Sequence, residues 1–386
     1  MQGIYLDHAA TTPIRPEVRQ AMEPYLADIY ANASSIYRQA QQARAAIDAA
    51  RDTVAACLRA RPSEVVFTSG GTESDNAALR GAAFAGQERG RHLVTTAIEH
   101  HAVLHTMEDL AARYGFELSV VKVPRDGIVR VSDIADALRP DTVLVSVMWA
   151  NNEIGTIQPI AEIASLVRNA GAVFHVDAVQ AAGAIPIDLS TLPVDLLSLS
   201  AHKFYGPKGS GVLFVRDGTP WWPTQSGGAQ ERERRAGTEN VAGIVGLARA
   251  LELAQVDRDE ESERLSQLRD FVLTDLERRI EGTVVNGDRE RRLPNNLNVS
   301  FDGVHGESLL VGLDLAGIMA SSGSACTSGS LEPSHVLQAI GVPRDLAQAS
   351  LRLTLGRCTT RGEAETALDV LDGLVRRLRS VSLAHA

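Results

Sequence analysis

One cysteine lies in a segment whose residue types suit chemistry better than packing. Cys326 falls within residues 321–330, where every other residue is serine, glycine, alanine or threonine. Such a segment has no apolar face that could bury the thiol. A thiol on such a tether can collect a group at one site and deliver it at another. Taken alone, the pattern is equally consistent with an ordinary exposed loop that contains a cysteine.

A lysine follows one of the apolar segments that are typical of buried strands. Lys203 comes after residues 196–199, and Ser200 and His202 flank it. Ligands of open α/β sheets bind at the carboxyl ends of the strands. A lysine in that position can form a Schiff base with an aldehyde cofactor. The alternative is a surface lysine at a strand end, which is common.

A glycine-rich turn follows another strand-like segment. Gly70, Gly71 and Thr72 come after residues 65–67 and precede a helical pattern. Small residues allow an anion to approach the backbone, and a helix N-terminus offers N–H donors without intrahelical partners. A phosphate group fits such a turn, although a glycine turn with an ordinary helix cap is an equal alternative.

Polar side chains follow two further strand-like segments. Asp177 directly follows residues 173–176. Its carboxylate there could pair with the protonated nitrogen of a pyridine ring or simply cap the next helix. Asn151 and Asn152 place amides after residues 143–147. Because the carboxyl ends of parallel strands meet at one edge of a sheet, these groups are expected to lie close together.

Histidines follow the strand-like residues 92–94 and have two interpretations. His100 could stack on an aromatic cofactor and shuttle protons. His101 and His105 have the i, i+4 spacing of metal ligands on a helix, but the sequence offers no evident third ligand. We therefore expect no metal site.

Seven short apolar segments, separated by helical patterns, predict an α/β fold with a mostly parallel sheet covered on both faces. A long helical pattern then runs from about residue 241 to 280, followed by strand-like residues 296–301 and 351–355. We interpret this part as a smaller α+β domain. The seven segments are residues 65–67, 92–94, 120–123, 143–147, 173–176, 196–199 and 212–215.

Composition excludes several classes of protein. The 386 residues carry a net charge of −10, which disfavours direct nucleic-acid binding. The three cysteines are too few and too scattered for a disulfide framework or a cysteine-based zinc site. The sequence shows no secretion signal and no membrane-spanning segment, so a cytoplasmic location is expected.

These motifs together resemble the cysteine desulfurases, which are pyridoxal-phosphate enzymes of the class V aminotransferase group. The likeness runs from residues 5–13 (YLDHAATTP) to residues 351–357 (LRLTLGR). Its most specific part is residues 321–336 (SSGSACTSGSLEPSHV), which are similar to the long-loop branch that feeds iron–sulfur cluster assembly and tRNA thiolation. The implied aminotransferase-like fold has a large domain, residues 14–258, and a small domain, residues 1–13 and 259–386.

The resemblance implies three catalytic residues. Lys203 would attach the cofactor and move the α-proton of the substrate. His100 would stack on the cofactor ring and assist acid–base steps. Cys326 would accept the sulfur of L-cysteine as a persulfide, leaving L-alanine.

The resemblance also implies the binding residues. Asp177 would pair with the pyridine nitrogen, with Gln180 and Asn152 near the ring hydroxyl. The residues expected at the phosphate are Gly71, Thr72, Ser200 and His202. Those expected at the substrate carboxylate are Asn32 and Arg352. Thr238 would reach the phosphate in the other subunit of a homodimer.

The expected partners are the substrate L-cysteine and a sulfur acceptor, either an iron–sulfur scaffold protein or a tRNA thiolase. Two alternatives stay open from the sequence. One is a selenocysteine lyase or another class V lyase or aminotransferase. The other is a non-catalytic scaffold with the same fold, against which the presence of Lys203, Asp177, His100 and Cys326 argues.

Overall fold

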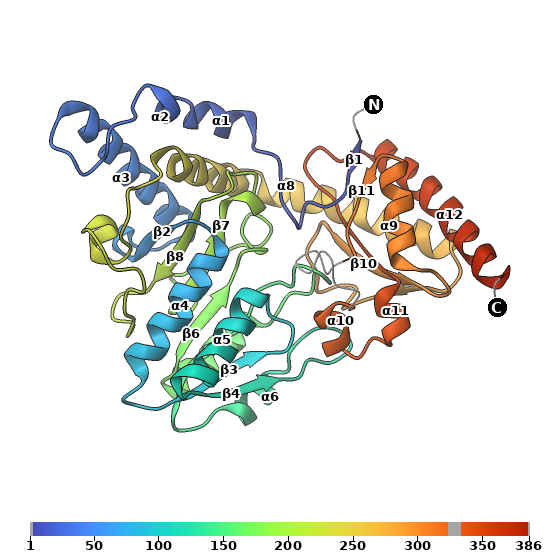
Figure 1. The fold of residues 1–386 in the computed structure, drawn as a ribbon, viewed down its shortest axis with the longest axis horizontal. Helices are drawn as coiled ribbons and strands as arrows, with labels where there is room; N and C mark the ends of the chain where they lie inside the picture. The colour runs from blue at the N-terminus through green and yellow to red at the C-terminus, as the bar shows by residue number, and fades with distance from the viewer. Residues whose placement is uncertain (1–2, 323–332, 385–386) are drawn as a thin grey trace.

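The protein folds into a larger and a smaller part, joined by one long helix (Figure 1). The computed structural model describes residues 3–322 and 333–384. The larger part is built on a seven-stranded sheet, and the smaller part on a three-stranded antiparallel sheet with a two-stranded parallel sheet beside it. Cys326 lies outside the described residues.

The seven-stranded sheet has the order β2-β8-β7-β6-β5-β3-β4. The four neighbouring pairs from β7 to β4 are parallel, and only β8 runs antiparallel to its neighbours β7 and β2. This confirms the predicted mostly parallel seven-stranded sheet. Its strands are β2 (Val65–Thr68), β3 (His92–Thr96), β4 (Glu117–Val121), β5 (Thr142–Ser146), β6 (Val173–Asp177), β7 (Leu196–Ser200) and β8 (Gly211–Val215).

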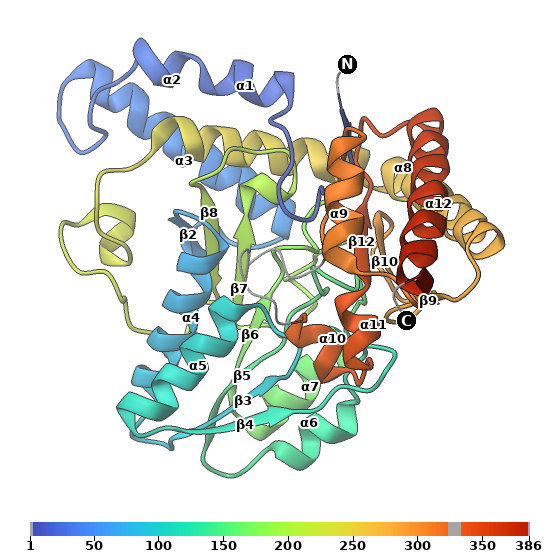
Figure 2. The ribbon, with the colours of Figure 1, turned by 45° about the vertical axis from the view of Figure 1, so that its right-hand side comes forward.

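Helices cover both faces of this sheet because neighbouring strand residues point to opposite sides. In β2, Val65 and Phe67 join one hydrophobic core, and Val66 between them joins another. The core containing Val66 is formed with α4 (Gly71–Gly86) and α5 (His101–Tyr114), as Figure 2 shows. The helices that contribute to the opposite core are α1 (Pro16–Met22), α3 (Arg38–Leu58), α6 (Val131–Ala137), α7 (Ile160–Ala170) and the first half of α8 (Val241–Arg279).

The remaining short elements of the larger part connect these layers. They are α2 (Pro24–Ala27) and three 3-10 turns, Pro62–Glu64, Ala201–Lys203 and Gln230–Glu233. Helices α10 (His335–Ala339) and α11 (Arg344–Gln348) also place apolar side chains in the core that contains Val65.

The smaller part has a separate core. The second half of α8 contributes Leu265, Val272 and Leu276 to it, together with Leu6 near the N-terminus. The long helix therefore takes part in two cores, and the predicted domain boundary after residue 258 stays a prediction. The other elements here are β1 (Ile4–Tyr5), β9 (Thr283–Val285), β10 (Asn296–Phe301), α9 (Gly306–Leu315), β11 (Ile318–Met319), β12 (Ser350–Thr354) and α12 (Arg361–Ala384).

A buried ion pair fastens the segment after β8 to the edge strand β2. Arg51 of α3 donates two hydrogen bonds to the Glu231 carboxylate, at 2.8 and 2.6 Å. The same carboxylate accepts a hydrogen bond from the backbone N–H of Phe67. This N–H would otherwise have no partner at the open edge of β2. Both side chains are buried, so each charge depends on the other.

Replacing Glu231 by alanine is expected to lower the free energy of unfolding by about 3–5 kcal/mol, because the Arg51 charge then stays buried without a counterion. Urea denaturation of the apo-protein measures the change. The control is the double variant Arg51→Met/Glu231→Leu, which removes both charges and should cost less than Glu231→Ala. A Glu231→Ala protein as stable as the wild type would show that the pair contributes nothing.

Candidate active site

A cavity of about 350 Å³ opens at the carboxyl ends of the parallel strands. The residues that line it come from the ends of β6 and β7, the start of α4 and α5, the segments after β5 and β1, and β12. They are Ala9, Ala10, Gly71, Thr72, Asp75, His100, Met148, Ala150, Asn152, Asp177, Val179, Gln180, Ser200, His202, Lys203 and Arg352. Every residue predicted to bind the cofactor, except Thr238, is among them.

Lys203 reaches the cavity from the 3-10 turn that follows β7. Its Nζ donates hydrogen bonds to the carbonyl oxygens of Ala9 and Ala10, at 2.6 and 2.8 Å. Residues 7–12, here called the N-terminal strap, thus hold the amine across the junction of the two parts. Gln180 Nε2 donates to the same Ala9 carbonyl at 3.0 Å.

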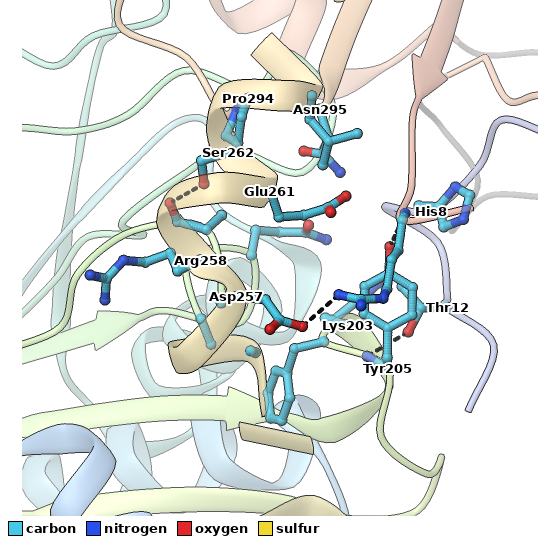
Figure 3. Close-up of a pocket in the computed structure, with 18 of the residues that line it drawn as sticks. His8, Thr12, Lys203, Tyr205, Asp257, Arg258, Glu261, Ser262, Pro294 and Asn295 are labelled. Carbon is cyan, nitrogen blue, oxygen red and sulfur yellow. Dashed lines mark hydrogen bonds and ion pairs between the residues drawn. The ribbon is translucent and has the colours of Figure 1, made fainter. Parts of the chain in front are cut away.

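A second, smaller cavity of about 80 Å³ shares Lys203 and Gln180 with the first one (Figure 3). Lys203, His8 and Thr12 contribute to its lining, and Asp257 and Glu261 face them from α8. Lys203 therefore lines two cavities, and its side chain is not packed inside a core.

Asp177 supplies a carboxylate at the end of β6. Burial raises its pKa to about 6, and its Oδ1 accepts a hydrogen bond from the backbone N–H of Val179 at 2.9 Å. A buried carboxyl of this kind favours a cationic partner, because ionising it alone in the interior is costly. The protonated nitrogen of a pyridine ring would be such a partner.

His100 is the N-cap residue of α5 and lines the cavity. Its Nδ1 accepts from the backbone N–H of Ala102 at 3.1 Å, which leaves the proton of the neutral ring on Nε2. Burial and, second, the charge of Lys203 lower the pKa of His100 to about 4. The ring is therefore neutral near pH 7 and can stack on an aromatic group.

The start of α4 forms an anion site. Gly70 precedes the helix and has no side chain to cap the first N–H groups, which leaves them for a ligand. Gly71 fits closely, since a Cβ atom there would lie 2.8 Å from Val179 Cγ2. Ser200 lies against the same turn, and His202 contacts the strap through Nδ1, 3.1 Å from Thr11 Oγ1.

Arg352 brings a cation from β12 of the smaller part into the cavity. Only 2% of the residue is exposed. Its Nη1 donates to the carbonyl of Asn152 at 3.0 Å, and its Nη2 donates to Asp7 Oδ1 at 2.6 Å. Within the described residues, its Nε has no hydrogen-bond partner. A carboxylate is the ligand that a guanidinium in this setting binds best.

The structure separates the two neighbouring asparagines. Asn151 is fully buried, donates to the carbonyl of Ile98 and accepts from the backbone N–H groups of Glu153 and Ile154. Asn152 lines the cavity. Asn151 therefore shapes the turn, and the predicted contact of Asn152 with the cofactor stays a prediction.

Two predicted residues lie outside this cavity. Asn32 is exposed between α2 and α3, where its Oδ1 accepts from the backbone N–H of Ser34. Thr238 is exposed just before α8. Their predicted contacts, with the substrate and with a cofactor in a second subunit, stay predictions.

The described residues on either side of the Cys326 segment contact the site. Ser321 pairs with Arg352, whose backbone N–H donates to the Ser321 carbonyl at 2.6 Å. After the segment, Ser334 donates to the buried carboxyl of Glu153, next to Asn152. The chain thus enters and leaves the Cys326 segment beside the cavity.

Sequence reasoning missed Asp75 and the two strap carbonyls. Asp75 lies in α4, one turn after Gly71, and is almost fully buried. Burial and, second, the nearby Asp177 raise its pKa well above the ordinary value. The sequence signal for Asp75 was an acidic residue on a helix face that otherwise carries small, apolar side chains. No sequence pattern marks the carbonyls.

The comparisons with known proteins agree with this geometry. The Aminotransferase class-V profile matches residues 4–366. The chain belongs to the class V aminotransferase family. Pyridoxal phosphate is therefore its cofactor, and the predicted resemblance and fold are confirmed.

Two similar relatives are named cysteine desulfurase IscS. One, from Dictyoglomus turgidum, is 51% identical over 98% of this chain and 96% of its own length. The other, from Methanosarcina thermophila, is 50% identical over 99% and 94%.

Two solved structures are also similar. A NifS-like protein superposes with a TM-score of 0.92 at 38% identity, covering 97% of this chain and all of that one. SspA in complex with cysteine has a TM-score of 0.81 at 36% identity, covering 91% and 98%. Among the described residues, no helix is long and apolar enough to cross a membrane.

A buried acid directly before His100 gives the site a pH-dependent element. Glu99 is completely buried, and its Oε1 accepts from Thr96 Oγ1 at 2.6 Å and from the backbone N–H of Met148 at 3.0 Å. It thereby ties the end of β3 to the segment after β5. Burial raises the pKa of Glu99 to about 8, so the folded protein keeps a proton there at neutral pH.

The unfolded chain releases this proton near pH 4.5, so the contribution of Glu99 to stability is complete below that pH and is lost as pH rises to about 8. Glu99→Gln keeps the Oε1 acceptor and removes the titration. Between pH 5 and 8, the unfolding free energy of the apo variant should fall less steeply with pH than that of the apo wild type. The difference between the two slopes should reach up to about 1.4 kcal/mol per pH unit. Exposed Glu88→Gln is the control, and equal slopes in Glu99→Gln and wild type would refute the assignment.

Proposed function

We propose that this protein is a pyridoxal-phosphate-dependent cysteine desulfurase that converts L-cysteine to L-alanine and leaves the sulfur as a persulfide on Cys326. The observation that carries the proposal is that Lys203, Asp177, His100 and Arg352 line one cavity. The names of the relatives at about 50% identity, and the cysteine-bound SspA structure, support the same substrate.

The residues of the cavity fit the cofactor. The uncapped start of α4, Ser200 and His202 would hold its phosphate, and Asp177 would hold the pyridine nitrogen. Asn152 and Gln180 would lie near the ring hydroxyl and His100 against the ring face, and all three line the cavity. When bound at Lys203, pyridoxal phosphate supplies an electron-withdrawing ring that makes the α-proton of the substrate acidic.

Lys203 then moves the proton. Its amine can take the α-proton only when it is uncharged, and the carbonyls of Ala9 and Ala10 lie ready to accept hydrogen bonds from the resulting ammonium. The neutral ring of His100 carries its proton on Nε2 and can therefore act as a hydrogen-bond donor. Arg352 would hold the substrate carboxylate and so fix which bond at the α-carbon faces Lys203.

Cys326 would take the sulfur. Its thiolate attacks the sulfur of the substrate, a sulfur–sulfur bond forms, and the carbon–sulfur bond breaks with its electron pair staying on carbon. That carbon then takes up a proton, and alanine leaves. The positions of Ser321 and Ser334 beside the cavity support this role, because the segment between them begins and ends at the site.

The finer assignments are part of the proposal. Asn32 would add to the substrate carboxylate site, and Thr238 would reach the cofactor phosphate in the second subunit of a homodimer. Exposure of both side chains leaves them available for such contacts. The persulfide would pass to an iron–sulfur scaffold or a tRNA thiolase in the cytoplasm. The two domains would divide after residues 13 and 258.

Purified holoprotein should release alanine from L-cysteine, and Cys326→Ser should lose this activity by at least about two orders of magnitude, as expected when a nucleophile is removed. The variant should keep its bound cofactor, read from the visible absorbance. The matched control is Cys358→Ser, which removes an exposed cysteine away from the cavity. Alanine and persulfide formation by Cys326→Ser at the wild-type rate would exclude the mechanism.

A further inference from the structure

Asp7 of the N-terminal strap contacts the cation of the site but has no assigned role. Its Oδ1 accepts a hydrogen bond from Arg352 Nη2 at 2.6 Å, which makes the two side chains an ion pair. The side chain of Asp7 is 18% exposed and that of Arg352 is 2% exposed. Asp7 also pairs in parallel with Thr354, two residues after Arg352 on β12. The contact is thus built into the backbone pairing of strap and strand.

The guanidinium of Arg352 is fixed from two directions. The carbonyl of Asn152 in the larger part holds Nη1, and Asp7 holds Nη2. Nε is buried and has no partner within the described parts of the chain. Contacts with described residues therefore use only part of its five donors, which leaves others for a ligand in the cavity that Arg352 lines.

A second acidic group near Arg352, Glu153, is less suited to hold it. Glu153 is fully buried, its Oε2 accepts from Ser334, and burial raises its pKa to about 7. Among the residues that the structure describes, Asp7 is the carboxylate in direct contact with Arg352. Without it, Arg352 would be a buried cation held by one backbone carbonyl, and a side chain in that state reorients or draws in water.

The same strap also holds the reactive amine. Asp7 contacts Arg352, and two residues later Ala9 accepts a hydrogen bond from Lys203 Nζ. Two residues of extended chain span at most about 7 Å. The strap therefore sets the spacing between the group that would bind the carboxylate of an amino acid and the amine that acts at its α-carbon.

We propose that Asp7 is a positioning residue, which orients Arg352 to receive the α-carboxylate of the substrate. The assignment rests on the proposed function, since it takes Arg352 as the carboxylate ligand. It predicts that Asp7 affects substrate binding much more than the chemical steps. The effect should depend on an oxygen acceptor at this position and should be absent for ligands that lack a carboxylate.

The test compares Asp7→Ala with Asp7→Asn in the holoenzyme. Asp7→Ala should raise KM for L-cysteine about tenfold to a hundredfold, the range for losing a hydrogen bond to a charged group, with kcat changed much less. Asp7→Asn keeps an oxygen acceptor and should restore most of the affinity. The matched control is Asp141→Asn, which removes a charge paired with exposed Arg139 at the amino-terminal end of β5.

Binding of the product gives a second readout that needs no turnover. The dissociation constant of L-alanine, followed by the visible absorbance of the holoenzyme, should rise in Asp7→Ala as KM does. That of ethylamine, which lacks the carboxylate, should stay within about twofold of the wild-type value. If Asp7→Ala cannot be purified, Asp7→Glu replaces it, because one added methylene displaces the carboxylate and should raise KM likewise.

An Asp7→Ala enzyme with wild-type KM for cysteine and wild-type affinity for alanine would overturn the proposal. So would equal losses of affinity for alanine and ethylamine, because Asp7 would then act on the whole site. Failure of the wild-type holoenzyme to release alanine from cysteine would instead refute the proposed function. The binding comparison of alanine with ethylamine would still decide the role of Asp7.

Discussion

The contact on which the site depends is the pair of hydrogen bonds from Lys203 Nζ to the carbonyls of Ala9 and Ala10. It joins the end of β7 in the larger part to the strap, which pairs with β12 of the smaller part. A lysine ammonium is strongly hydrated, and two carbonyl oxygens replace part of that water inside a narrow junction. The reactive amine and the cation Arg352 are therefore held by one segment, even though 149 residues separate them in sequence (352 − 203).

The sheet supplies the second constraint. Because β3, β5, β6 and β7 are neighbouring parallel strands, the segments after their carboxyl ends meet at one edge. His100, Asn152 and Lys203 come from these segments, and Asp177 is the last residue of β6. Their different roles follow from their surroundings: burial raises the pKa of Asp177 and lowers that of His100, which leaves a carboxyl that favours a cation beside an uncharged ring.

Much of this could be predicted from the sequence, because the patterns involved are local. Six of the seven strands of the large sheet coincide closely with their apolar segments. The strand β4 begins at Glu117, three residues before its predicted start, because it is an edge strand whose exposed residues weaken the apolar signal. Lys203 and Asp177 were identifiable because each comes at or shortly after the end of a largely apolar segment.

The contacts of the strap could not be predicted in the same way. A backbone carbonyl has no sequence signature, and Ala9 and Lys203 are 194 residues apart. Asp7 was visible only as part of a motif, since its ion pair with Arg352 depends on the register of the strap against β12. The assignments of Asn32, Thr238 and Cys326 still rest on the family resemblance.

The most direct test of this account is to locate the cofactor on the chain. The sequence contains three lysines, Lys122, Lys203 and Lys208, so borohydride reduction of the holoprotein followed by peptide mass spectrometry gives an unambiguous assignment. The account predicts one pyridoxyl adduct, on Lys203. An adduct on Lys122 or Lys208, or a fully loaded protein without any adduct, would contradict it.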